Sequence, residues 1–203
     1  MDEPDIDPGS ATRAGVDRAM LGNATMACMP SPTAEELSAA LPAAAREIEE
    51  FVGNAGWDQP AQVFALVPTS ELLAAEPELA DQLDQSAPLT PVAQEALPNE
   101  DLGEALAQIA WPEQVAGCAV AQEIVVLPPE AEAELPTDAE QARQAAAQHP
   151  QRQEARLVAA VLRSGGQTCL LRLRDPEQTG GELIQDPSLA PNLTKALLAT
   201  FAD

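Results

Sequence analysis

The sequence predicts an α/β (mixed α/β) fold, and three observations carry that prediction. Apolar residues make up 45% of the 203-residue chain, which is enough to bury a sizeable core in one domain. Apolar runs of strand length alternate with amphipathic stretches at helical spacing. A Gly165-Gly166 pair joins two apolar runs, as in a β-hairpin. We therefore expect a central, mostly covered sheet that includes a C-terminal β-hairpin (about 155–174), with helices packed around it.

The N-terminal segment 1–32 is expected to be a disordered acidic, Pro-rich tail, because it lacks hydrophobic periodicity. It contains all four methionines, so the translation start could be any of them; they are Met1, Met20, Met26 and Met29. A single α/β domain is predicted over 33–203, with a linker-like excursion around 128–150.

Ordered structure is expected to begin at Thr33, whose side chain can form a capping box with Glu36. An apolar stripe follows at the spacing of an amphipathic helix; its members are Leu37, Leu41, Ala44, Ile48 and Phe51. Pro42 interrupts this stripe, which predicts a kink or two abutting helices.

The middle of the chain predicts two strands and two helices. The first strand is expected over 61–67 and a short helix over 69–76. Residues 77–98 are Pro-rich and acidic, which favours a surface excursion, and a helix over 100–109 follows. The run 117–127 is apolar nearly throughout, so this second strand is expected to lie centrally in the sheet.

The C-terminal hairpin carries the clearest register prediction. A tight turn at Gly165-Gly166 pairs Val158 with Leu173, Ala160 with Leu171, and Leu162 with Cys169 on one apolar side. The other side then carries three arginines among apolar neighbours; these are Arg163, Arg172 and Arg174 among Leu157, Ala159, Val161, Thr168 and Leu170.

Two further helices are predicted in the C-terminal half. An Ala/Gln-rich helix is expected around 138–147. The last helix is expected over 191–201, with proline at a permitted first-turn position. Its apolar stripe consists of Leu193, Leu197 and Phe201.

The charge of the chain is strongly negative and unevenly placed. Net charge is −23, and residues 47–142 hold 20 acidic side chains without a single Lys or Arg. This balance argues against binding to nucleic-acid backbones or to anionic membrane surfaces. No apolar run is long enough for a membrane span, and the acidic N-terminus does not resemble a signal peptide. A cytoplasmic location is the resulting expectation.

The three cysteines fit neither a metal site nor a disulfide framework, since Cys28, Cys118 and Cys169 are odd in number and widely spaced. Cys118 and Cys169 lie in apolar runs, which favours buried, reduced thiols.

The arginine face of the hairpin is the main candidate ligand site. Guanidinium groups of Arg163, Arg172 and Arg174 on one surface would suit a carboxylate or phosphate ligand. The alternative is that they neutralise acidic side chains of the base-free segment. Glu123, inside an apolar strand, would either pair with an arginine or lie at a site with a shifted pKa.

Two loops add candidate binding residues. The segment Trp57-Asp58-Gln59 enters the first strand, so Trp57 could be a stacking platform or could instead plug the core. The only histidine, His149, is followed by Glu154 and Arg156 and could serve acid–base chemistry or simply occupy a turn.

No cofactor site is recognisable, and one weak metal candidate exists. Glu130, Glu132 and Glu134 alternate in a segment expected to be extended, so they could hold a divalent cation, above all where an oligomer brings copies together. A solvated loop is the simpler alternative.

Three blocks of the sequence resemble a family of uncharacterised actinobacteria-specific proteins. The blocks are 49–80 with its GWDQP motif, 109–129 with WPEQVAGCA, and 149–174 with LRSGG. The resemblance covers about residues 40–203 and implies a nucleoside-phosphorylase-like topology, with no established activity. It marks Trp57, Asp58, Gln59, Pro60, Trp111, Pro112, Gly117, Cys118, His149, Arg163, Arg172 and Arg174 as motif positions. The chain departs from the family pattern at Ile124, where arginine is usual.

Two functions follow as hypotheses. The first is a non-enzymatic cytoplasmic binding or assembly module, with a homo-oligomer as one form of assembly. The second is an enzyme or sensor that binds a small anionic or nucleoside-like ligand through the arginine face; it rests on analogy of fold.

Overall fold

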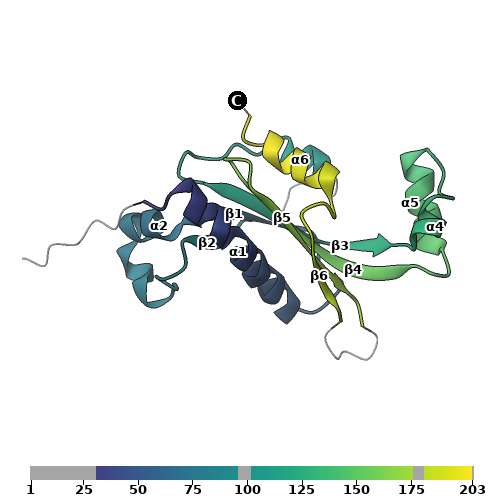
Figure 1. The fold of residues 1–203 in the computed structure, drawn as a ribbon, viewed down its shortest axis with the longest axis horizontal. Helices are drawn as coiled ribbons and strands as arrows, with labels where there is room; N and C mark the ends of the chain where they lie inside the picture. The colour runs from purple at the N-terminus through teal and green to yellow at the C-terminus, as the bar shows by residue number, and fades with distance from the viewer. Residues whose placement is uncertain (1–30, 96–101, 176–180, 203) are drawn as a thin grey trace, which may run out of the picture.

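The computed structural model describes residues 31–95, 102–175 and 181–202, and these form one antiparallel sheet with helices on both faces (Figure 1). The strands are β1 (Gln62–Pro68), β2 (Leu89–Ala93), β3 (Gly117–Val126), β4 (Gln153–Leu162), β5 (Gln167–Leu173) and β6 (Leu183–Gln185). Their order is β2-β1-β3-β4-β5-β6. The mixed α/β class and the central place of β3 are therefore confirmed.

Six α-helices surround the sheet in the described ranges. They are α1 (Ala34–Asn54), α2 (Thr69–Ala75), α3 (Leu102–Leu106), α4 (Pro129–Glu132), α5 (Ala139–Gln148) and α6 (Pro191–Ala199). None of them combines the length and the apolar character needed to cross a membrane. The predicted tail lies almost wholly outside the described residues, so its disorder stays a prediction.

The N-terminus of α1 is held by the predicted capping box. The Glu36 amide donates to Thr33 Oγ1 at 3.2 Å, and the Thr33 amide donates to Glu36 Oε2 at 2.7 Å. Hydrogen bonding also lowers the pKa of the Glu36 carboxyl below its ordinary value. The helix then runs through Pro42 as one element, so the alternative of two abutting helices is wrong.

α1 packs against one face of the sheet and forms the first core. Its members include Leu41, Ala44, Ile48 and Val52 of α1 with Phe64, Leu66, Ala119, Val158 and Leu170 of the strands. The predicted stripe is wrong only at its end, where Phe51 is 57% exposed and Val52 is buried instead. A helical turn has 3.6 residues, so both positions border the stripe and the sheet decides between them.

α6 and α3 cover the opposite face, where the second core lies. It includes Val63, Leu106, Cys118, Val120, Leu157, Ala159, Val161, Cys169, Leu171 and Leu197. Cys118 and Cys169 are buried free thiols, as predicted. Burial raises the pKa of the Cys118 thiol to about 12. Leu193 and Phe201 pack against the same core, which confirms the predicted stripe of the last helix.

The excursions predicted as irregular contain regular structure. β2 lies within 77–98 and pairs with β1, although Pro91 stands in it. Proline is tolerated there because β2 is an edge strand. The short strand β6 pairs with β5 at the other edge. Within 128–150, α4 and α5 form an arm at the far end of β3 and β4 (Figure 1).

The hairpin forms where predicted, but its register differs from the prediction. Val158 pairs with Leu170 and Leu157 with Leu171, three residues away from the expected partners. The loop is longer than two residues because Gly165 adopts a left-handed φ of +99° and donates to Leu162 O at 2.8 Å. When the register shifts by an odd number of residues, the side chains of one strand that were expected on one face of the sheet lie on the opposite face relative to those of its partner. Arg163 therefore does not share a face with Arg172 and Arg174.

Candidate functional site

The Trp57 loop, residues 55–60, connects α1 to β1 and contains two positive φ angles. Gly56 has φ +89° and Asp58 has φ +66°. Aspartate is among the few side chains that tolerate this region, and such positions gather at functional sites. The loop is tied to the sheet by Glu123 of β3, which accepts the amides of Asp58 at 3.0 Å and Gln59 at 3.2 Å.

A charged row crosses the sheet beneath this loop, on the face that α1 covers. The register places Glu123 opposite Arg156 and Arg156 opposite Arg172, on β3, β4 and β5. Arg156 is only 2% exposed and lies 3.9 Å from Glu123. The predicted pairing of Glu123 with an arginine is therefore present, and its partner is Arg156.

Glu49 of α1 completes this buried cluster from above. It accepts Arg172 Nε at 2.6 Å and Arg172 Nη2 at 2.7 Å, a two-pronged geometry that suits guanidinium and carboxylate. Arg156 Nη1 lies 3.6 Å from the same carboxylate. Hydrogen bonding to Glu49 raises the pKa of Arg172. Both arginines are therefore held to the helix through one carboxylate.

Sequence reasoning missed Glu49, although a signal for it was present. Glu49 follows Ala45 by four residues and precedes Val52 by three, so it belongs to the buried face of α1. A carboxylate at such a position needs a cationic partner, and the arginines of the apolar hairpin were candidates for that partner.

The outer part of the site joins Arg174 to the Trp57 loop. Arg174 contacts both carboxylate oxygens of Asp58 at 3.2 Å and also pairs with Glu154. Hydrogen bonds to Asp58 and Glu154 raise the pKa of Arg174. The Trp57 ring lies 4.5 Å from the Arg156 guanidinium and 5.3 Å from that of Arg174. Cation–π contacts thus join the inner and outer arginines.

An open pocket of about 420 Å³ lies against this outer part. Its lining includes Trp57, Asp58, Arg172, Arg174 and Asp175. The arginines around it are already paired within the protein, because Arg156, Arg172 and Arg174 contact the carboxylates of Glu49, Asp58, Glu123 and Glu154. An anionic ligand would have to displace one of these carboxylates.

Two predicted site residues lie elsewhere. Arg163 is on the α6 face, where it donates to the Pro112 carbonyl at 3.1 Å and lies 4.7 Å from the Phe201 ring. His149 caps the C-terminus of α5, and its Nδ1 accepts the Gln151 amide at 3.2 Å. Glu154, the predicted neighbour of His149, pairs with Arg174 instead.

The glutamates proposed for a cation are not in an extended segment. Glu130 and Glu132 lie in α4, and Glu134 lies in the turn that follows. The prediction failed because Pro129 starts a helix at its first-turn position. In the part of the chain that the structure describes, no group of three or more His, Cys, Asp or Glu side chains could hold a metal ion.

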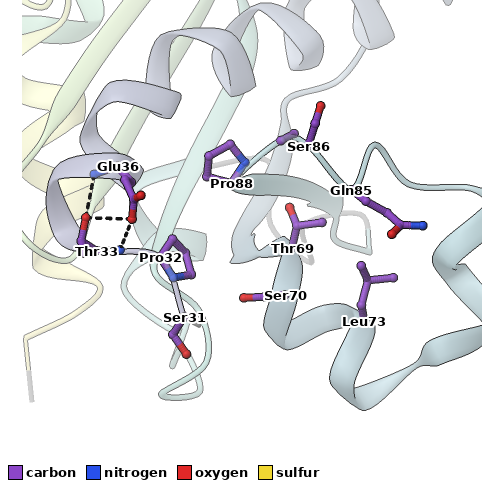
Figure 2. Close-up of a pocket in the computed structure, with 11 residues that line it drawn as sticks. Ser31, Pro32, Thr33, Glu36, Thr69, Ser70, Leu73, Gln85, Ser86 and Pro88 are labelled. Carbon is purple, nitrogen blue, oxygen red and sulfur yellow. Dashed lines mark hydrogen bonds between the residues drawn. The ribbon is translucent and has the colours of Figure 1, made fainter. Parts of the chain in front are cut away.

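A second pocket, of 350 Å³, lies between the start of α1 and α2 (Figure 2). Two of its lining residues, Thr33 and Glu36, are hydrogen-bonded to each other in the capping box. A third, Thr69, has its Oγ1 within hydrogen-bond distance of Thr90 Oγ1, at 2.9 Å. In Figure 2 the Ser70 hydroxyl points toward the start of α1. Within the described ranges this buried hydroxyl has no hydrogen-bond partner.

A family model described as PPA1309-like protein matches residues 41–202. The chain belongs to the PPA1309-like protein family. No curated protein and no solved structure matches it. The matched range of the family excludes the N-terminal tail and includes the Trp57 loop, the charged row and the hairpin.

Proposed function

We propose that this member of the PPA1309-like family is a non-enzymatic binding module. The observation that supports the proposal is the occupation of Arg156, Arg172 and Arg174 by carboxylates from other elements. Guanidinium groups paired in this way stabilise the fold, and few of their N–H groups remain to bind a reacting substrate. A buried charge that is already paired is also costly to separate from its partner.

The proposal includes a cytoplasmic location, without nucleic-acid or membrane partners, in keeping with the net charge of −23. A homo-oligomer, the actinobacterial restriction and the nucleoside-phosphorylase-like topology stay predictions. Light scattering over a range of protein concentrations would assign an assembly role if the mass rises with concentration.

A thermal-shift panel with phosphate, nucleosides, nucleotides and divalent metals tests the proposal. A ligand that binds only the folded state raises Tm, by an amount that grows with its concentration. We expect no selective rise from any of these compounds. A rise with phosphate or a nucleoside that is lost in Arg174→Gln, but kept in Arg143→Gln, would overturn the proposal.

One observation favours the rival function, a site for a small anionic or nucleoside-like ligand. Asp58 is 77% exposed at its side chain, while Arg174 is 34% exposed, so their contact lies at the mouth of the pocket. An anion could replace Asp58 there without disturbing the inner pair of Glu49 and Arg172. The same thermal-shift panel distinguishes the two functions.

A further inference from the structure

The α6 face of the sheet is only partly covered by its helices. β3 and β4 each have ten residues, which corresponds to roughly 33 Å of strand. α6 has nine residues and is therefore only about 13 Å long. By contrast, the 21 residues of α1 give about 31 Å on the other face. One end of the strands thus extends beyond α6.

A groove of 320 Å³ lies at that end, and most of the residues that line it are apolar. Its floor consists of strand side chains, among them the partly exposed Ile124 and the nearly buried Leu157 and Leu171. Leu135 and Ala146 of the α4–α5 arm line one wall, and Leu189, which precedes α6, lines the other. Figure 1 shows the arm at one end of β3 and β4, set apart from α6. In a layered α/β fold such a space on a sheet face is the place of a helix.

The rim of the groove is acidic. Glu132 lines it directly, and the arm segment 129–148 holds five acidic side chains against Arg143 alone. Arg143 pairs with Glu140 at 3.6 Å. Asp186 lies in the same turn as Leu189, whose amide donates to the Asp186 carbonyl at 3.3 Å, and hydrogen bonds from Ser188 lower the pKa of the Asp186 carboxyl. The arm that lines the groove therefore carries more acidic than basic side chains.

We propose that this groove docks an amphipathic helix of a partner protein, with an apolar stripe toward Ile124 and Leu189 and basic side chains toward the rim. Apolar anchors at helical spacing would bury these partly exposed side chains, as in other helix-in-groove complexes. A second copy of the chain is a poor occupant, because each copy carries a net charge of −23. The inference rests on the proposed binding function and names its partner by chemistry.

Binding of a synthetic peptide to the whole chain tests the inference. The probe is a fluorescent peptide of about 18 residues, with leucines at helical spacing and lysines on the opposite face. One control peptide replaces the lysines with glutamates, and another has the same composition in scrambled order. Fluorescence anisotropy at about 150 mM salt measures affinity while screening nonspecific attraction. We expect the lysine peptide to bind at least about tenfold more tightly than either control.

Two leucines form a matched pair of variants, because Leu189 and Leu183 are both 37% exposed. Only Leu189 lines the groove, so Leu189→Glu is expected to weaken peptide binding by at least about tenfold, and Leu183→Glu by less than about twofold. Should Leu189→Glu not fold, Ala146→Glu places a charge in the opposite wall. Equal affinities of the groove and control variants, or equal binding of the scrambled peptide, would overturn the inference.

Charge is tested separately at the rim. Glu132→Gln is expected to weaken binding by about two- to fivefold, whereas Glu78→Gln, an exposed glutamate in the 3₁₀ turn 77–81, should have no effect. Absence of peptide binding to the wild-type chain overturns this inference alone. A nucleoside or phosphate thermal shift lost in Arg174→Gln overturns the proposed function as well, so the two failures are distinguishable.

Discussion

The same end of the central strands presents two unlike surfaces. On the α1 face, the row of Glu123, Arg156 and Arg172 is closed by Glu49. On the α6 face, the adjacent residues Leu157 and Leu171 are nearly buried and lie at the floor of a groove. Side chains of a strand alternate between faces, so one sequence can build a closed charged cluster behind an apolar groove. We infer that the first stabilises the fold and that the second is available for a partner.

The largest effect is expected from Glu49→Gln, which removes the charge that compensates Arg156 and Arg172. Breaking a buried ion pair by losing one partner costs about 3–5 kcal/mol. Urea unfolding should show a loss of this size in the free energy of unfolding. Glu50→Gln, at the exposed neighbouring position, is the control and should change stability by less than about 0.5 kcal/mol. A similar loss in both variants would mean that the cluster does not hold α1 on the sheet.

Glu123→Gln tests the link between this cluster and the Trp57 loop. Glutamine keeps one acceptor oxygen for the Asp58 and Gln59 amides but loses the attraction to Arg156. We expect a loss of about 1–2 kcal/mol. Each kcal/mol corresponds to about 2–4 °C in Tm for a chain of this size. An unchanged Tm, equal to that of an exposed control such as Glu130→Gln, would contradict the role given to Glu123.

Arg163→Lys examines how α6 is attached to the opposite face. Arg163 donates to the Pro112 carbonyl at 3.1 Å and lies over the Phe201 ring at 4.7 Å. Lysine cannot reproduce both contacts, so we expect a loss of about 1 kcal/mol. Hydrogen exchange should become faster in α6 while that of α1 stays the same. Uniformly faster exchange in both helices would argue against a local attachment.

The smallest effect, with the opposite sign, is expected from Glu47→Gln on α1. Partial burial, then repulsion from Asp84 and Glu50, raise the pKa of Glu47 above its ordinary value of 4.5. A carboxyl whose pKa is raised by folding stabilises least when ionised, so stability falls as the pH rises through the folded-state pKa. Glu47→Gln should therefore raise Tm slightly at pH 7, and the gain should vanish below the ordinary pKa. A gain that persists in acid would have another cause.

Much of the fold could be predicted because its signals are local. The capping box at Thr33, the apolar run of β3 and the stripe of α6 depend on neighbours along the chain, and all three are confirmed. The edge strand β2 was missed because Pro91 reads as irregular structure until the sheet shows that it lies at an edge. The helix α4 was missed because a single turn has almost no periodicity to detect.

The candidate site was predicted in its composition and misjudged in its geometry. Asp58, Glu123, Arg172 and Arg174 do belong to connected charged contacts, which their residue types suggested. Arg163 was assigned to this group through an incorrect hairpin register, and the left-handed Gly165 is the physical reason. The role of Glu49 could be predicted only by asking which carboxylate on a buried helix face pairs with the arginines.

The sequence by itself determined the fold class, the acidic charge and the alternation that separates charged from apolar side chains on β3, β4 and β5. These properties depend on composition and on the period of two along a strand. Only the tertiary structure decided that the arginines are paired with carboxylates and that a groove stays open between α6 and the α4–α5 arm. Both depend on distances between segments far apart in the chain, namely Glu49 against Arg172 and the short α6 against the long strands. Local patterns do not encode which of these elements meet in the folded chain.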